Sequence, residues 1–123
     1  MPISTASAPA PAASSRNLKP LKIIRSEETI RDVADIHLFI AMSNPAAADR
    51  FLDALLLSFR TLAQWPEVGP RYQSNRAELS EMRFWPVRRF TNYLIFYRVT
   101  GRPRRLHIIR VFHGAQDVPQ VLG

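Results

Sequence analysis

The segment from Arg83 to Arg110 concentrates cationic side chains that could bind an anionic macromolecule. It contains eight arginines and no carboxylate, whereas residues 1–82 contain nine lysines or arginines and nine aspartates or glutamates. Asp117 is the only residue with a formal charge after this segment, so the net charge of +7 comes from the segment itself. Like charges that are packed together repel one another, and a fold tolerates this cost most easily where the surface meets a negatively charged partner.

Aromatic rings are interspersed with these arginines, and the combination fits two kinds of binding surface. Aromatic stacking together with cations is used to bind single-stranded nucleic acid. Arginine and aromatic residues also dominate the binding energy of protein–protein interfaces, and arginine pairs with carboxylates in a planar, bidentate manner. We predict a partner-binding surface that contains Arg83, Trp85, Arg88, Arg89, Arg98, Arg110 and His113.

The same segment contains groups that could instead cleave RNA. Cleavage by the 2′-hydroxyl group needs a base, an acid and cations around the phosphate. Tyr93 and His113 could supply the acid and the base, and Arg83 and Arg110 the cations. A histidine at the corner between a strand and a loop more commonly forms a hydrogen bond with the backbone. We therefore expect a binding protein without a catalytic residue, with the nuclease as the alternative.

Aspartate pairs on two predicted helices are the candidates for a metal site. Asp32 and Asp35 are three residues apart, and Asp49 and Asp53 are four residues apart, which places each pair on one face of a helix. Without a matching histidine or glutamate, these pairs are interpreted as solvated helix faces. The chain has no cysteine and only four glycines, which excludes thiolate sites and argues against a phosphate-binding glycine loop. We predict no metal and no cofactor.

A single small domain must position these side chains, because 123 residues suffice for one modest core. Residues 1–19 are rich in alanine, proline and serine and are predicted to form a disordered tail. Residues 20–119 are predicted to form the domain. No run of eighteen apolar residues is present, so no membrane-spanning helix is expected. The absence of cysteine fits a reducing cytoplasm, which is the predicted location.

The first half of the domain predicts a strand at residues 21–25 followed by two helices. Ser26 is a suitable N-cap for the first helix. Asn44 and Pro45 separate the two helices, with Asn44 as the N-cap of the second and Pro45 as its first residue. The second helix extends to about Gln64, and the short link predicts an antiparallel helical hairpin. Its apolar stripe contains Ala48, Phe51, Leu52, Leu55, Phe59, Leu62 and Ala63, and that of the first helix contains Ile30, Val33, His37 and Ile40.

The second half predicts three strands at residues 80–85, 92–99 and 105–113, the last two joined by a turn at residues 100–103. The element order is then β-α-α-β-β-β. The economical α+β packing is a helical hairpin on one face of a small, largely antiparallel sheet. Phe96 and Tyr97 are expected in the core, whereas Trp85 and Phe90 fit either the core or the surface.

Four strings in this order resemble the ParE branch of the RelE/ParE toxin superfamily, namely DIHLFIAMSNPAAADRFLDAL, LAQWPEVG, MRFWPVRRFTNYLIFYRV and IIRVFHGAQD. The resemblance covers residues from about Lys22 to Val118 and implies the same fold. It also implies the toxin of a type II toxin–antitoxin pair, which poisons DNA gyrase by binding it. A cognate antitoxin would neutralise the toxin in a hetero-oligomer, and the arginine-rich segment predicts that the antitoxin contributes an acidic segment.

The sequence departs from the nuclease branch of this superfamily. RelE-like toxins are ribosome-dependent mRNA endonucleases, and they carry an arginine directly after the tyrosine that opens the central strand. Here Leu94 follows Tyr93, and no tyrosine follows Tyr97. These differences favour gyrase as the target. In the ParE branch the last strand is usually followed by His-Gly-Ala-Arg-Asp, and here Gln116 replaces the arginine, which leaves an inactive descendant as a further possibility. No helix-turn-helix pattern is present, so no sequence-specific DNA binding is predicted.

Overall fold

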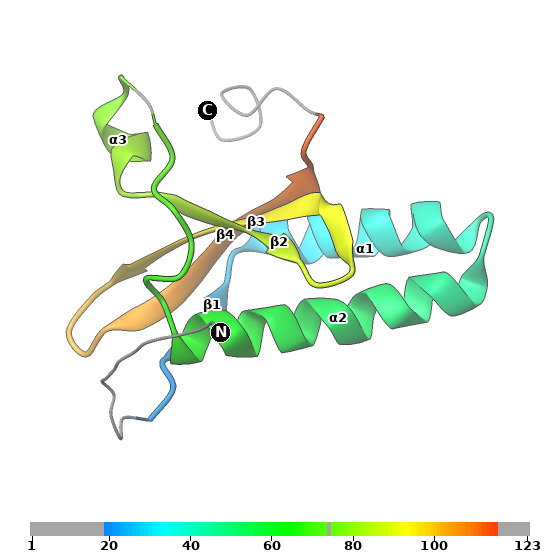
Figure 1. The fold of residues 1–123 in the computed structure, drawn as a ribbon, viewed down its shortest axis with the longest axis horizontal. Coiled ribbons are helices and arrows are strands. Elements are labelled where there is room, and N and C mark those ends of the chain that lie inside the picture. Colours follow the sequence, from blue (N-terminus) through cyan, green and yellow to red (C-terminus); the bar gives the residue numbers. More distant parts are fainter. Residues whose placement is uncertain (1–18, 74, 116–123) are drawn as a thin grey trace, which may run out of the picture.

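The computed structural model describes residues 19–73 and 75–115 and has an α+β fold (Figure 1). The predicted element order is confirmed, with one short additional helix. The predicted tail lies almost wholly outside the described residues, as does Gln116. The elements are β1 (Lys22–Arg25), α1 (Glu27–Ala41), α2 (Pro45–Gln64), α3 (Ala77–Ser80), β2 (Arg83–Val87), β3 (Phe90–Thr100) and β4 (Arg105–His113).

The sheet has four strands in the order β1-β4-β3-β2. Strands β2, β3 and β4 are antiparallel neighbours, and β1 pairs with β4 in parallel. Helices α1 and α2 form an antiparallel hairpin on one face of the sheet (Figure 1). The prediction of a helical hairpin on a largely antiparallel sheet is therefore confirmed.

Local capping explains why the helix boundaries could be predicted. The Ser26 side chain accepts a hydrogen bond from the Thr29 N–H at 3.0 Å, and the Asn44 side chain accepts one from the Ala47 N–H at 3.0 Å. Each cap satisfies a backbone donor that the helix itself leaves unpaired. Pro45 occupies the first turn of α2, where its missing N–H costs nothing.

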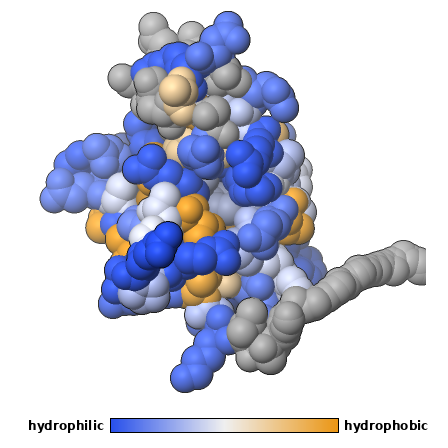
Figure 2. Space-filling view, turned by 90° about the vertical axis from the view of Figure 1, so that its left-hand side faces the viewer, coloured by the Kyte–Doolittle hydropathy of each residue, from blue (hydrophilic) through white to orange (hydrophobic). Residues whose placement is uncertain are grey.

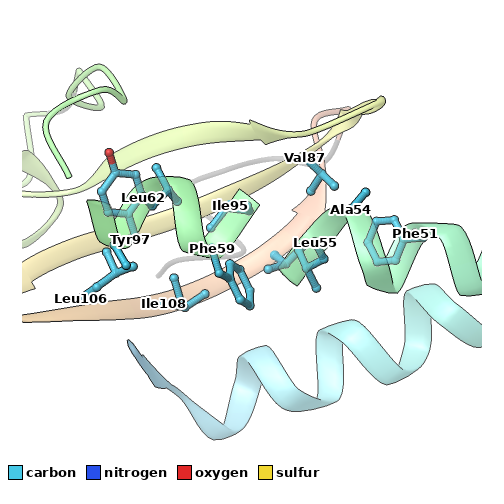
Figure 3. Packing of buried hydrophobic residues seen from close by; sticks show 12 residues of the cluster. Phe51, Ala54, Leu55, Phe59, Leu62, Val87, Ile95, Tyr97, Leu106 and Ile108 are labelled. Atoms are coloured by element: carbon cyan, nitrogen blue, oxygen red, sulfur yellow. The ribbon is translucent and has the colours of Figure 1, made fainter. Parts of the chain in front are cut away.

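The main core lies between α2 and the sheet (Figure 3). Phe51, Leu55, Phe59 and Leu62 of α2 are at most 2% exposed, and they pack with buried residues of β3 and β4 that include Ile95. Burial of a side chain of this size contributes about 1.5–3 kcal/mol. The predicted apolar stripe of α2 is thus confirmed, with Leu52 half-buried at its edge.

The predicted stripe of α1 is partly wrong. Ile30 is 57% exposed, and the half-buried apolar contacts of α1 with the core come from Val33, Ile36 and Ile40. Thr29 is the buried residue of this helix. The physical reason is that α1 turns a polar row of side chains toward β4, and that row displaces Ile30 from the core.

A second, smaller core lies on the opposite face of the sheet. It contains Leu79, Met82, Phe96 and Phe112, with Phe96 stacked on Phe112 at 4.9 Å between ring centroids. Phe96 is therefore buried as predicted, but on the face away from the helical hairpin, whereas Tyr97 packs in the main core.

The predicted strand at residues 80–85 begins too early. Residues 77–80 form α3, and β2 begins at Arg83. The Met82 N–H, just after α3, donates a hydrogen bond to the Leu79 carbonyl at 3.1 Å, which keeps these two residues close together. Both side chains are buried in the second core, with exposed fractions of 4% and 3%. This non-local burial outweighed the local strand pattern.

Strand β4 contains a bulge that changes which side chains face the helices. Phe96 pairs with Arg110 and Tyr97 pairs with Ile108, so β4 has one extra residue, Ile109. Ile108 and Val111 both belong to the main core although they are three residues apart. A bulge bends a strand and redirects its side chains, and here it makes Val111 rather than Arg110 the core residue after Ile108. The Arg110 side chain contacts Asp32 of α1.

Candidate partner-binding surfaces

The arginines between residues 83 and 110 do not form one continuous surface. Arg88 and Arg89 lie in the turn before β3, whereas Arg98 and Arg102 lie near or beyond its far end. A strand of eleven residues is roughly 35 Å long. The predicted partner-binding residues are therefore spread along the length of the sheet, and a partner that contacts all of them must span it.

Two of the arginines are bound to groups in the loop after α2. Arg83 Nη1 donates a hydrogen bond to the Gly69 carbonyl oxygen at 2.7 Å, and Arg104 Nη2 lies 3.2 Å from Glu67 Oε2. The Arg104 pair is exposed on both sides, so it contributes little to stability. Arg83, which is half-buried, attaches this loop to β2.

Arg110 forms the most complete ion pair of the described residues. Its Nε and Nη2 donate to Asp32 Oδ2 and Oδ1 at 2.7 and 2.8 Å, in a bidentate arrangement. The Asp32 side chain is only 13% exposed. Hydrogen bonding to Asp32 raises the pKa of Arg110 further above its already high ordinary value. The interpretation of Asp32 as part of a solvated helix face was wrong, because its side chain is largely buried against β4 and is paired with Arg110.

Asp32 belongs to a row of polar side chains that covers the edge of β4. Strand β1 pairs only as far as Ile108, so the edge beyond it has no strand partner. The Ser26 Oγ donates to the Ile109 carbonyl at 2.8 Å, Thr29 Oγ1 donates to the Ile108 carbonyl at 3.1 Å, and Asp32 Oδ2 accepts from the Val111 N–H at 3.0 Å. Buried backbone groups need such partners.

This polar row was not predicted from the sequence, although the spacing of its residues contains a signal for it. Ser26, Thr29 and Asp32 recur every three residues at the start of α1, which places them on one face of the helix. A helix that packs this polar face against a sheet must satisfy groups there, and an unpaired strand edge supplies both donors and acceptors.

A groove of about 550 Å³ lies beside the Asp32–Arg110 pair, between α1 and the ends of β3 and β4. Tyr93 and His113 line it, and their rings meet edge to face at 5.2 Å between centroids. His113 Nδ1 accepts a hydrogen bond from the Ala115 N–H at 3.0 Å, the backbone role expected at a strand-to-loop corner. Phe39 of α1, which is 69% exposed, lies at the same groove.

The four residues considered for RNA cleavage are only partly brought together. Tyr93, His113 and Arg110 line the groove. Arg83 pairs with Tyr97, four positions along β3 from Tyr93, which corresponds to roughly 13 Å. It therefore does not belong to the same site.

The far end of the sheet carries a second group of cations, which we call the basic sheet end. Lys22 and Arg105 are register partners on β1 and β4, and Arg98 is the register partner of His107 on β3 and β4. Like charges placed directly opposite one another are destabilising. This end of the molecule faces the viewer in Figure 2 and is covered mainly by hydrophilic residues. No described carboxylate forms an ion pair with Arg98 or Lys22.

Two aromatic residues that the sequence could not assign to the core or to the surface both pack against the main core. Trp85 and Phe90 are half-buried, and the Phe90 ring meets Phe51 edge to face at 5.4 Å. Trp85 therefore offers a partner only the exposed part of its ring.

Within residues 19–73 and 75–115, no three histidine, cysteine or acidic side chains gather closely enough to hold a metal ion. No helix in these ranges combines the length and the apolar character needed to cross a bilayer.

Comparison with known proteins gives a family and a fold. A family described as "ParE toxin of type II toxin-antitoxin system, parDE" matches residues 23–118. A structure of the chromosomal ParDE toxin–antitoxin system from P. aeruginosa has a TM-score of 0.62 at 16% identity and covers 76% of this chain and 95% of its own. The YoeB/ParE toxin from Agrobacterium tumefaciens has a TM-score of 0.51 at 15% identity and covers 76% of this chain and 98% of its own.

At these identities the two structures establish the likeness of the fold, and the comparison with curated protein sequences found no match. The match to the family extends over most of the described domain, from β1 to beyond β4. The chain belongs to the ParE toxin family of type II toxin–antitoxin systems.

Proposed function

We propose that this toxin inhibits DNA gyrase by direct binding in the bacterial cytoplasm, and that a cognate antitoxin neutralises it with an acidic segment in a hetero-oligomer. Membership of the ParE family supports the toxin class and the existence of an antitoxin. The resemblance of the sequence to the ParE branch supports gyrase as the target. The arginine-rich segment supports an acidic partner.

The Asp32–Arg110 pair is the observation that favours binding over catalysis. A cation that stabilises a phosphate during cleavage must direct its N–H groups at the substrate. Arg110 directs Nε and Nη2 at Asp32, and Arg83 donates to the Gly69 carbonyl. Both candidate phosphate ligands thus have acceptors within the chain, and a substrate would have to compete with them.

Exposed arginines at the two ends of the sheet support docking to a macromolecule. Arg88, Arg89, Arg98 and Arg102 are exposed, and no ion pair joins them to another described residue. Exposed charges of this kind raise association rates with an oppositely charged partner.

Purified gyrase tests the proposal directly. We expect the toxin to inhibit supercoiling of relaxed plasmid and to increase the amount of cleaved DNA, and the cognate antitoxin to reverse both effects. Variants of the arginines at the two sheet ends need a matched control. Arg31→Gln removes an exposed arginine of α1 that lies outside both ends, and this variant should inhibit gyrase as the unmodified toxin does. Unaltered supercoiling at a large molar excess of toxin would refute gyrase as the target.

The contact between Tyr93 and His113 favours one alternative, a ribosome-dependent mRNA endonuclease. Their rings lie together at a groove that also contains Arg110. Under this alternative, induction of the toxin cleaves mRNA within codons, and Tyr93→Phe and His113→Gln abolish cleavage. Intact mRNA in growth-arrested cells would rule it out.

A further inference from the structure

A hollow of about 230 Å³ lies between α2 and the turn that joins β2 to β3. Its lining differs entirely from that of the groove beside Asp32. We call it the arginine hollow. Its lining residues are Arg50, Asp53, Ala54 and Leu57 of α2 and Arg88 and Arg89 of the turn.

The turn is fixed to α2 by contacts on both sides of the two arginines. Val87 is fully buried before them, and the ring of Phe90 packs against α2 after them. The Arg88 N–H donates a hydrogen bond to Ser58 Oγ at 2.9 Å. Ser58 is 3% exposed and donates in turn to the Ala54 carbonyl at 2.8 Å. The backbone of the hollow is therefore organised before any ligand arrives, which lowers the entropic cost of binding.

The charges of the hollow are unbalanced. Three guanidinium groups, those of Arg50, Arg88 and Arg89, share it with one carboxylate, that of Asp53. Within the described part of the chain, none of these three arginines forms an ion pair or donates a side-chain hydrogen bond. Concentrated like charge is unfavourable in the free protein, and a negatively charged ligand would relieve it.

Arg89 also has an unusual backbone conformation. Its φ angle is 68°, in the left-handed region that costs conformational energy for a residue with a long side chain. Two-residue hairpin turns favour glycine or asparagine at such positions. A local cost of this kind often accompanies a functional role of the side chain, and a role of Arg89 in binding would account for it.

The remaining lining distinguishes between two kinds of anionic ligand. Leu57 is 48% exposed, and with Ala54 it adds an apolar surface to the hollow. A nucleic acid backbone would leave this apolar surface unused. A peptide that carries carboxylates and an apolar side chain uses both the arginines and the leucine.

We propose that the arginine hollow binds an acidic peptide segment, whose carboxylates pair with Arg50, Arg88 and Arg89 while an apolar side chain of the segment contacts Leu57. Bidentate pairing between guanidinium and carboxylate supplies the geometry. This inference rests on the proposed function, because it assigns the segment to the cognate antitoxin.

Short overlapping peptides that span the cognate antitoxin test the proposal by fluorescence anisotropy with the full toxin chain. We expect an acidic peptide with at least one large apolar residue to bind, and Arg89→Gly and Arg50→Gln each to weaken it about tenfold. Arg60→Gln, which changes an exposed arginine of the same helix outside the hollow, should leave the affinity unchanged.

Thermal unfolding of the same variants separates binding from folding. Glycine adopts a φ of 68° without strain, so Arg89→Gly should be at least as stable as the unmodified chain. Loss of peptide binding in a variant of unchanged or higher stability supports the hollow as the site. Two results would overturn the proposal. In the first, the peptides bind Arg89→Gly and Arg50→Gln as tightly as they bind the unmodified chain. In the second, an oligothymidylate binds more tightly than any peptide and depends on the same arginines.

Failure of this inference can be told apart from failure of the proposed function. If the toxin inhibits gyrase and the intact antitoxin reverses the inhibition, but no peptide depends on Arg50 and Arg89, only the hollow is refuted. If the toxin has no effect on gyrase, the proposed function is refuted whatever the peptides do.

Discussion

Asp32 and Arg110 are 78 residues apart in the sequence, and their side chains form a bidentate ion pair with donor–acceptor distances of 2.7 and 2.8 Å. The same carboxylate accepts a hydrogen bond from the Val111 N–H. One side chain of α1 thus satisfies both a cation and a backbone donor beside the bulge of β4. The pair connects the helical hairpin to the strand at the point where β1 no longer covers it.

We expect Asp32→Asn to lower the free energy of unfolding by about 2–4 kcal/mol, because it leaves the partly buried guanidinium of Arg110 without its counterion. Denaturant titration measures the change. Asp35→Asn is the matched control, since Asp35 lies on the same helix and is exposed, and we expect its effect to stay within about 0.5 kcal/mol. Equal effects of the two substitutions would contradict a structural role of the pair.

The helices of this fold could be predicted because their signals are local. The caps at Ser26 and Asn44 and the apolar stripe of α2 each lie within a few residues of the element that they define. The role of Asp32 could not be predicted, because its partner is determined by the packing of α1 on β4. A period-two reading of β4 places Arg110 in line with the core residues Leu106 and Ile108, whereas the bulge at Ile109 gives the core position to Val111.

The division of the arginines is a second feature that sequence alone did not reveal. Composition shows how many cations a segment contains, but the length and direction of β3 determine how far apart they lie. Arg50 of α2 was missed for a related reason, since it is distant in sequence from Arg88 and Arg89 and joins them only through the packing of the turn on the helix.

Tyr97 should make stability fall in alkaline solution. Its hydroxyl donates to the Pro66 carbonyl at 2.8 Å and accepts from the Gly69 N–H at 3.0 Å, and burial raises its pKa above the ordinary value of 10.0. The folded state therefore keeps the proton where the unfolded state loses it. The stabilisation is fully present below about pH 10 and is lost as the pH rises through the folded pKa.

Denaturation midpoints measured across this alkaline range should decrease less for Tyr97→Phe than for the unmodified chain. The variant itself should be destabilised by about 1–3 kcal/mol at neutral pH, because the Gly69 N–H and the Pro66 carbonyl lose a partner. Identical pH profiles for the two proteins would assign the alkaline effect to other groups.

Gly69 lies where a side chain does not fit. A Cβ atom at this position would lie 2.5 Å from both the Phe84 carbonyl oxygen and the Tyr97 hydroxyl oxygen. We expect Gly69→Ala to destabilise the fold by about 1–3 kcal/mol or more, because neither the backbone nor the buried phenol can move freely. Thermal unfolding measures the change. Gly114→Ala, whose new Cβ atom would lie no closer than 3.3 Å to its nearest neighbour, should lower the stability less. Equal costs would show that the loop after α2 adjusts readily.

The basic sheet end and the Asp32–Arg110 pair should differ in how they affect toxicity. Arg98 and Arg102 are exposed, so Arg98→Gln combined with Arg102→Gln should weaken binding to gyrase about tenfold through lost charge while leaving the thermal midpoint unchanged. Arg110→Gln should instead lower the midpoint, because Asp32 is only 13% exposed and loses its counterion. Gyrase inhibition and thermal unfolding, measured on the same preparations, distinguish the two cases. Full inhibition by the Arg98 and Arg102 double variant would show that these two arginines do not contribute to gyrase binding.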